Sequence, residues 1–168
     1  MWEGHKREAV IACLVGITLF VSDFAFGWLT LLTGAIPMIF IIAFIIGLIS
    51  GGFARGLLCT LASWIAGLVI GFALVPIVMA ESITPDTTLL GILVVTIYYP
   101  LRGTYDVWFD VTGIAALAVF ILSFVITPII YLISLVFGGA GGAIGGFMRR
   151  RMMQTNLAAE SSQLGSEG

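Results

Sequence analysis

Long stretches without formal charge constrain the fold of this chain more than any other feature. From Ala9 to Ala54 the single charged residue is Asp23. Across all 168 residues, 10% are charged and 60% are hydrophobic, whereas soluble domains carry about 25% charged residues. Because helices satisfy their own backbone hydrogen bonds in lipid, the sequence predicts an all-α integral membrane protein.

The apolar sequence is interrupted at points that separate membrane spans. A transmembrane helix needs about 20 apolar residues, and glycine and proline favour helix ends. Gly27, Pro37 and Arg55 supply such interruptions. We predict a bundle of four transmembrane helices within residues 9–152. The predicted spans are 9–28, 35–52, 57–79 and 111–137, with an outer loop at 80–110 between the last two.

The outer loop contains a shorter apolar segment, Leu89–Tyr99, which is too short to cross a membrane as a helix. It is a half-helix, an interfacial segment, or the beginning of a fifth span broken at Pro100. A fifth span would bury Arg102 and Asp106, and each buried charge costs about 2.5–3.5 kcal/mol. We therefore favour four spans and expect residues 89–108 at the outer surface, with entry into the bilayer left open.

The basic residues predict the orientation of the bundle, because cytoplasmic loops are enriched in Lys and Arg. With a cytoplasmic N-terminus, all but one of them face the cytoplasm: Lys6, Arg7, Arg55, Arg149, Arg150 and Arg151. We expect these residues to anchor the helix ends at the lipid headgroups. The prediction is a multi-pass protein of the cell membrane with both termini cytoplasmic, in which residues 1–8 form the N-terminal segment.

Two predictions concern the ends of the chain. Residues 153–168 are polar and rich in glycine and serine, so we expect a disordered cytoplasmic tail. Residues 1–27 also resemble a signal peptide, but their apolar run is longer than usual and a clear cleavage site is missing. We therefore expect the first span to be retained.

Glycines recur at four-residue spacing, which marks faces where helices approach closely in lipid. The predicted packing residues are Gly47 with Gly51, Gly52 with Gly56, Gly67 with Gly71, and the series Gly138, Gly142 and Gly146. These faces pack within one compact bundle, or they form the interface of a homo-oligomer or of a larger membrane complex.

Two glycine-rich segments also resemble each other. Residues 47–55 are GLISGGFAR and residues 141–149 are GGAIGGFMR, so both fit the pattern G-x-x-x-G-G-F-x-R. The match suggests two repeated helical hairpins related by an axis along the membrane normal. A chance match is the alternative, because glycine and phenylalanine are abundant in this chain.

Asp23 is the one acidic residue within a predicted span. Intramembrane carboxylates suggest an ion or proton site because they are costly to bury. The alternative is that Asp23 lies near the outer interface, where Ser22 and Asp23 cap a short helix.

No arrangement of residues suggests catalysis. The chain has one histidine, His5, and no paired carboxylates within a span. Cys13 and Cys59 lie in apolar runs, where free cysteines behave as small hydrophobic residues. There is no metal-ligand spacing and no basic stripe for nucleic acid. We expect neither an enzyme nor a metal, cofactor or nucleic-acid partner, and the lipid bilayer is the one partner that the sequence implies.

Several segments taken together resemble a known family. These are KREAV near the start, GLISGGFARG in the middle, and GGAGGAIGG followed by basic residues near the end. They resemble a family of small glycine-rich archaeal membrane proteins of unknown function that have four predicted helices. The resemblance covers about residues 6–151 and implies a four-helix membrane fold without catalytic residues.

The leading functional hypothesis is a non-enzymatic structural or accessory subunit of the membrane. It rests on abundant glycine packing and very little polarity within the spans. The alternatives are a small oligomeric transporter or channel that uses Asp23, and a holin-like pore former.

Overall fold

The computed structural model describes residues 2–33, 36–78, 88–102, 104–105 and 115–164, and every regular element in these residues is helical. The all-α prediction is therefore confirmed for them. The elements are α1 (Trp2–Phe26), α2 (Trp28–Thr33), α3 (Met38–Ser50), α4 (Phe53–Val78), α5 (Leu89–Tyr98), the short 3-10 helix η1 (Tyr99–Leu101) and α7 (Ala115–Leu164).

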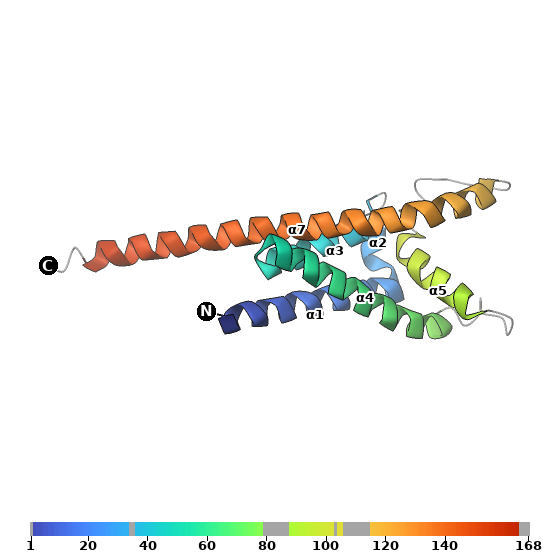
Figure 1. The fold of residues 1–168 in the computed structure, drawn as a ribbon, viewed down its shortest axis with the longest axis horizontal. Helices are drawn as coiled ribbons and strands as arrows, with labels where there is room; N and C mark the ends of the chain where they lie inside the picture. Colours follow the sequence, from blue (N-terminus) through green and yellow to red (C-terminus); the bar gives the residue numbers. More distant parts are fainter. Residues whose placement is uncertain (1, 34–35, 79–87, 103, 106–114, 165–168) are drawn as a thin grey trace.

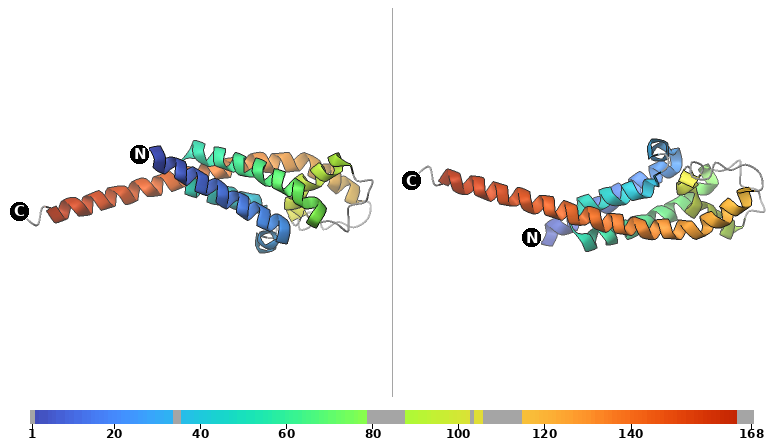
Figure 2. Two further views of the ribbon diagram at one scale, coloured as in Figure 1. Left: turned by 90° about the horizontal axis from the view of Figure 1, so that it is seen from below. Right: turned by 90° about the horizontal axis from the view of Figure 1, so that it is seen from above.

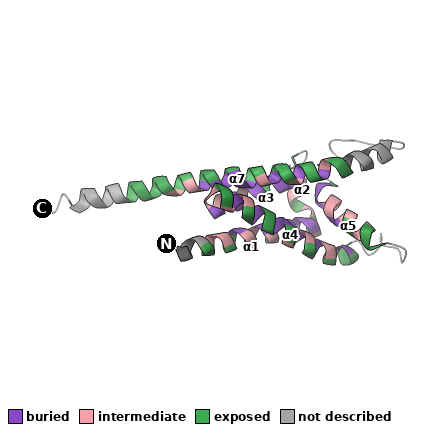
Figure 3. Ribbon diagram, in the orientation of Figure 1, coloured by how far each residue is buried: buried purple, intermediate pink, exposed green. Residues whose placement is uncertain are grey.

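Helix α7 runs along the full length of the molecule, and the other helices gather beside one part of it (Figure 1). Both termini lie toward the same end, with the C-terminal end of α7 projecting beyond the N-terminus (Figure 2). The buried faces of the helices point into the region where α1, α3, α4 and α7 meet (Figure 3). Helix α3 is enclosed there, with Met38, Ile39, Ile42, Ala43, Ile46, Gly47 and Ser50 buried.

In the part of the chain that the structure describes, three helical segments are long and apolar enough to cross a membrane: Lys6–Phe26, Phe53–Val78 and Phe124–Asn156. This is compatible with the predicted membrane location. Helix α3, where the second span is predicted, is shorter at 13 residues. At 1.5 Å per residue it covers about 20 Å, less than the roughly 30 Å hydrocarbon core. The other short apolar helix is Leu89–Leu101.

Two glycines in the left-handed conformation end helices. Gly27 has a φ of 65° and Gly51 a φ of 67°, values that glycine adopts without a steric penalty. The N–H of Gly27 donates to the carbonyl of Asp23 at 2.6 Å, and that of Gly51 donates to the carbonyl of Gly47 at 3.1 Å. The first glycine turns α1 into α2, and the second turns α3 into α4.

Helix α7 differs from the sequence prediction at its C-terminal end. The predicted fourth span ended at residue 137, and residues 153–168 were expected to be disordered, but α7 continues through Leu164. The prediction of disorder is wrong for residues 153–164, while 165–168 lie outside the described residues. The sequence from Phe147 to Leu164 contains neither glycine nor proline and is rich in Met, Gln, Ala, Leu and Arg, which are good helix formers.

The predicted outer loop also contains regular structure. Helix α5 and η1 occupy residues 89–101, and Pro100 lies within η1. Thr88 caps α5, because its hydroxyl accepts a hydrogen bond from the N–H of Gly91 at 3.2 Å. Residues 79–87, 103 and 106–114 of the predicted span end, loop and fourth span lie outside the described residues.

Candidate functional site

In the described residues, helices approach closely at a glycine contact, which is formed by Gly47, Gly52, Gly56, Gly138 and Gly142. A Cβ atom at Gly47 or at Gly56 would collide with the backbone of Gly138. A Cβ atom at Gly142 would collide with the backbone of Gly52. The glycine contact therefore joins α3, α4 and α7 backbone to backbone, as small residues do between helices in lipid.

The remaining glycines predicted to pack also lie between helices of the same chain. Gly146 lies against the carbonyl of Gly51, Gly67 against the ring of Phe20, and Gly71 against Phe24 and Thr96. The structure thus places every predicted packing glycine at an intramolecular contact.

Sequence reasoning missed Gly16, whose Cα lies against Ile46 and Ser63. It has no second glycine four residues away, so the four-residue spacing rule gave no indication of it. A close approach that one glycine makes to larger side chains of another helix leaves no pattern in the sequence.

A charged cluster joins the helix ends near the N-terminus. Glu8 of α1 forms an ion pair with Arg149 of α7, and its Oε2 lies 3.9 Å from Nη1 of Arg55 in α4. Nη2 of Arg149 also donates to the carbonyl of Ile49 at 2.5 Å, near the end of α3. About one third of each charged side chain is exposed. The carboxylate of Glu8 therefore links α1, α4 and α7 at the edge of the bundle, and Arg149 extends the link to α3.

The sequence predicted Arg55 and Arg149 as separate cytoplasmic anchors, and the structure brings them together around Glu8. Sequence reasoning missed Glu8, although it is the acidic residue nearest the first span. The other predicted anchors, Lys6, Arg7, Arg150 and Arg151, have exposed side chains. The guanidinium of Arg151 lies over the ring of Phe147, 4.8 Å from its centroid.

Asp23 is buried, with 2% of its surface exposed. Its Oδ1 accepts a hydrogen bond from the N–H of Leu29 at 2.5 Å, in the first turn of α2. Next to it, the hydroxyl of Ser22 accepts a hydrogen bond from Nε1 of Trp28 at 3.2 Å. Asp23 therefore caps the start of α2 across the Gly27 turn, while Ser22 bonds to the side chain of Trp28 and not to the helix backbone.

Further polar side chains inside the bundle bond to neighbouring helices. Nε1 of Trp64 donates to the hydroxyl of Ser134 at 2.8 Å, and that hydroxyl donates to the carbonyl of Tyr131 at 2.6 Å. The hydroxyls of Tyr105 and Thr127 are 2.7 Å apart. These contacts hold α4 and the segment after α5 against α7. Hydrogen bonds are directional, so they specify how the helices are oriented more precisely than apolar contacts alone would.

The two cysteines lie at the contact between α1 and α4. Both are free thiols. Sγ of Cys59 donates to the carbonyl of Ala9 at 3.7 Å, and Sγ of Cys13 donates to the carbonyl of Cys59 at 3.8 Å. Cys59 is buried and Cys13 is half-buried, and in this setting both act as small packing side chains.

Among the described residues, no group of three His, Cys, Asp or Glu side chains is placed to hold a metal ion. Comparison of the chain with protein-family models, with curated proteins and with solved structures finds no match.

Proposed function

We propose that this chain is a multi-pass protein of the cell membrane that acts as a structural or accessory subunit, not as an enzyme. The observation that supports this proposal most directly is the structural role of the Asp23 carboxylate. The one acidic side chain within the predicted spans is buried, and its carboxylate caps α2. An ion or proton pathway would need such a charge to face a passage through the membrane.

The proposal includes four membrane crossings. Arg55, near the start of α4, lies beside Glu8, near the start of α1. The chain therefore returns from the Phe26 end of α1 to the Glu8 end before α4 begins. Helices α2 and α3 make that return, which supports α3 as the second crossing despite its length. Helix α7 then brings the chain back to the same end a second time, since Arg149 also reaches Glu8.

The orientation follows from the end of the bundle at which the basic residues lie. Lys6, Arg7, Arg55 and the run Arg149–Arg151 all belong to the end of the molecule that carries Glu8. We assign this end to the cytoplasm by the positive-inside rule. Both termini are then cytoplasmic, since four crossings return the chain to the side on which it began.

The projecting end of α7 supports the proposed accessory role. Its side chains from Arg150 to Asn156 are exposed, and this part of the helix extends beyond the rest of the bundle (Figure 1). A rigid bundle held by the glycine contact would present this helix in the cytoplasm at a fixed angle. A larger membrane complex or a second copy of the chain could attach there.

A flux assay tests the proposal. Purified protein is reconstituted in liposomes loaded with a pH-sensitive or potassium-sensitive dye, and the wild type is compared with Asp23→Asn. Asparagine caps helices about as well as aspartate, so the variant is expected to fold. We expect both proteins to leak no faster than empty liposomes.

Two results would contradict the structural role. Flux through the wild type that is lost in Asp23→Asn would establish the transporter alternative. Flux in both proteins, together with collapse of the membrane potential when the chain is expressed in a host cell, would establish the pore former.

A further inference from the structure

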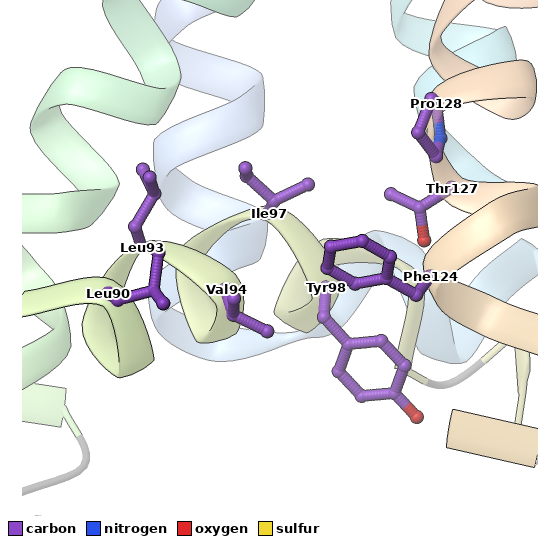
Figure 4. A pocket seen from close by; sticks show the side chains of 8 residues that line it. All are labelled: Leu90, Leu93, Val94, Ile97, Tyr98, Phe124, Thr127 and Pro128. Atoms are coloured by element: carbon purple, nitrogen blue, oxygen red, sulfur yellow. The ribbon is translucent and has the colours of Figure 1, made fainter. Parts of the chain in front are cut away.

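Helix α5 lies between α4 and α7 and leaves apolar grooves on both of its sides. The groove between α5 and α7 has a volume of about 200 Å³. Leu90, Leu93, Val94 and Ile97 of α5 form one wall, and Phe124 and Pro128 of α7 form the other (Figure 4). A second, more open groove of about 600 Å³ lies between α5 and α4. Helix α5 is thus bordered by apolar space on two sides.

The contacts of α5 place it below the outer surface of the bundle. A Cβ atom at Gly71 of α4 would meet the methyl group of Thr96 of α5. Gly71 lies about 24 Å along α4 from Arg55 at 1.5 Å per residue, within a hydrocarbon core of roughly 30 Å. The rings of Phe24 and Tyr99 are also in contact, with centroids 5.2 Å apart. The groove therefore opens at a depth where hydrocarbon surrounds the protein.

The polar side chains at this groove are engaged by the protein itself. The groove is also lined by Thr127 and Tyr98. The hydroxyl of Thr127 is 2.7 Å from that of Tyr105. The ring of Tyr98 stacks on the ring of Tyr105, with centroids 5.3 Å apart and planes 17° apart. A polar ligand would lose its hydrogen bonds to water here and gain little in return.

We propose that the groove between α5 and α7 binds one hydrocarbon chain of a membrane lipid from the outer leaflet. An apolar cavity does not hold water stably, and an empty one would leave its walls without contacts. A hydrocarbon chain supplies those contacts and has no groups that need hydrogen bonds. Helix α5 then acts as a half-helix that enters the membrane and holds a resident lipid. This inference rests on the proposed membrane insertion of the bundle.

Spin labels test the environment of the groove. Single cysteines replace Val94 in the groove and Leu132 on the exposed surface of α7, in a chain whose Cys13 and Cys59 are replaced by alanine. The labelled proteins are reconstituted in phosphatidylcholine vesicles, and collisions with oxygen and with a water-soluble nickel chelate are measured. We expect both labels to meet oxygen and to be shielded from nickel.

The two labels separate failure of the inference from failure of the proposed function. Nickel access at Leu132 would show that the helix is not in lipid, which overturns the proposed function. With Leu132 shielded, nickel access at Val94 would show an aqueous groove. Shielding of Val94 from both reagents would show that protein covers it. Either result at Val94 overturns the lipid assignment alone.

Lipid retention tests whether the lipid stays bound in the groove during purification. The protein is purified in mild detergent with phosphatidylcholine present, and native mass spectrometry counts the lipids that remain bound. Val94→Trp fills the groove, and Leu132→Trp adds the same bulk on the exposed surface. We expect one retained lipid in the wild type and in Leu132→Trp, and a roughly tenfold lower retained fraction in Val94→Trp, a change in affinity of 1.4 kcal/mol. Equal retention by the two variants, at equal melting temperature, would overturn the assignment.

Discussion

The two G-x-x-x-G-G-F-x-R segments adopt different backbones. In the first, residues 47–55, Gly51 turns the chain with a φ of 67° and separates α3 from α4. In the second, residues 141–149, the chain stays helical throughout, inside α7. Both segments nevertheless end in an arginine near Glu8, and they face each other through the glycine contact. The shared pattern thus specifies close packing and a charged end but does not specify a turn.

The two segments are followed by different kinds of sequence. After Arg55 come Gly56 and an apolar run that must re-enter the bundle as α4. After Arg149 come Arg150, Arg151 and a polar sequence of good helix formers.

The largest expected effect lies where the two segments touch. Gly142→Leu places a side chain against the backbone of Gly52, which cannot move aside without displacing α4. We expect the free energy of unfolding to fall by about 3 kcal/mol, at the upper end of the range for overpacking. Thermal unfolding in detergent micelles measures it. Ala140→Leu adds bulk at an exposed position on the same helix and should unfold near the wild-type temperature. An equal drop in melting temperature in both variants would show that the glycine contact does not determine the stability of the bundle.

The turn in the first segment should be the next most sensitive feature. Gly51→Ala forces an L-residue into the left-handed region, at a cost of about 1–2 kcal/mol. Gly51→Asn should cost less, because asparagine tolerates this conformation better than alanine. The melting temperatures of the two variants give the ranking. If asparagine is the worse replacement, crowding against the side chain of Arg149 controls this position instead of backbone strain.

The two arginines should differ in their contribution to stability. Arg149 has both an ion pair with Glu8 and a hydrogen bond to Ile49, whereas Arg55 lies 3.9 Å from Glu8. We expect Arg149→Gln to lower the free energy of unfolding by about 1 kcal/mol, since solvent screens these partly exposed groups. Arg55→Gln should change it by less than half of that.

A double-mutant cycle identifies the partner in this cluster. Glu8→Gln should add little to the loss in Arg149→Gln, because both variants break the same ion pair. Additive losses would show that the two residues act independently, and an equal loss in Arg55→Gln would contradict the ranking.

The smallest effect is expected beyond the second segment. Deleting residues 157–168 removes the projecting end of α7, and the side chains just before it are exposed. We expect an unchanged melting temperature and a loss of far-UV circular dichroism at 222 nm in proportion to the helix removed. A large drop in melting temperature would show that this end of α7 packs against the bundle.

Much of this architecture could be predicted because it follows local patterns. The uncharged runs predict apolar helices, and the four-residue spacing finds Gly47, Gly138 and Gly142 at contacts between helices. Four-residue spacing predicts a packing face independently of tertiary structure, because it places residues on one side of a helix.

The remaining features depend on contacts that no local pattern encodes. Glu8 meets Arg149 only after α1, α4 and α7 are packed together. The length of α7 was missed because glycine runs usually end helices, while here the packing against α3 and α4 supports residues 138–146. The role of Asp23 as a cap depends on the turn at Gly27, which places Leu29 within reach of its carboxylate.

We propose that the chain crosses the membrane four times and keeps both termini in the cytoplasm. Cysteine accessibility tests it most directly, with Cys13 and Cys59 replaced and single cysteines placed at Glu3, Ser82, Arg102 and Gln154. Intact cells are treated with a membrane-impermeant thiol reagent, and permeabilised cells serve as the control. The account predicts labelling at Ser82 and Arg102 in intact cells, and labelling at Glu3 and Gln154 only after permeabilisation. Labelling of Gln154 but not of Glu3 in intact cells would mean an odd number of crossings and would contradict the account.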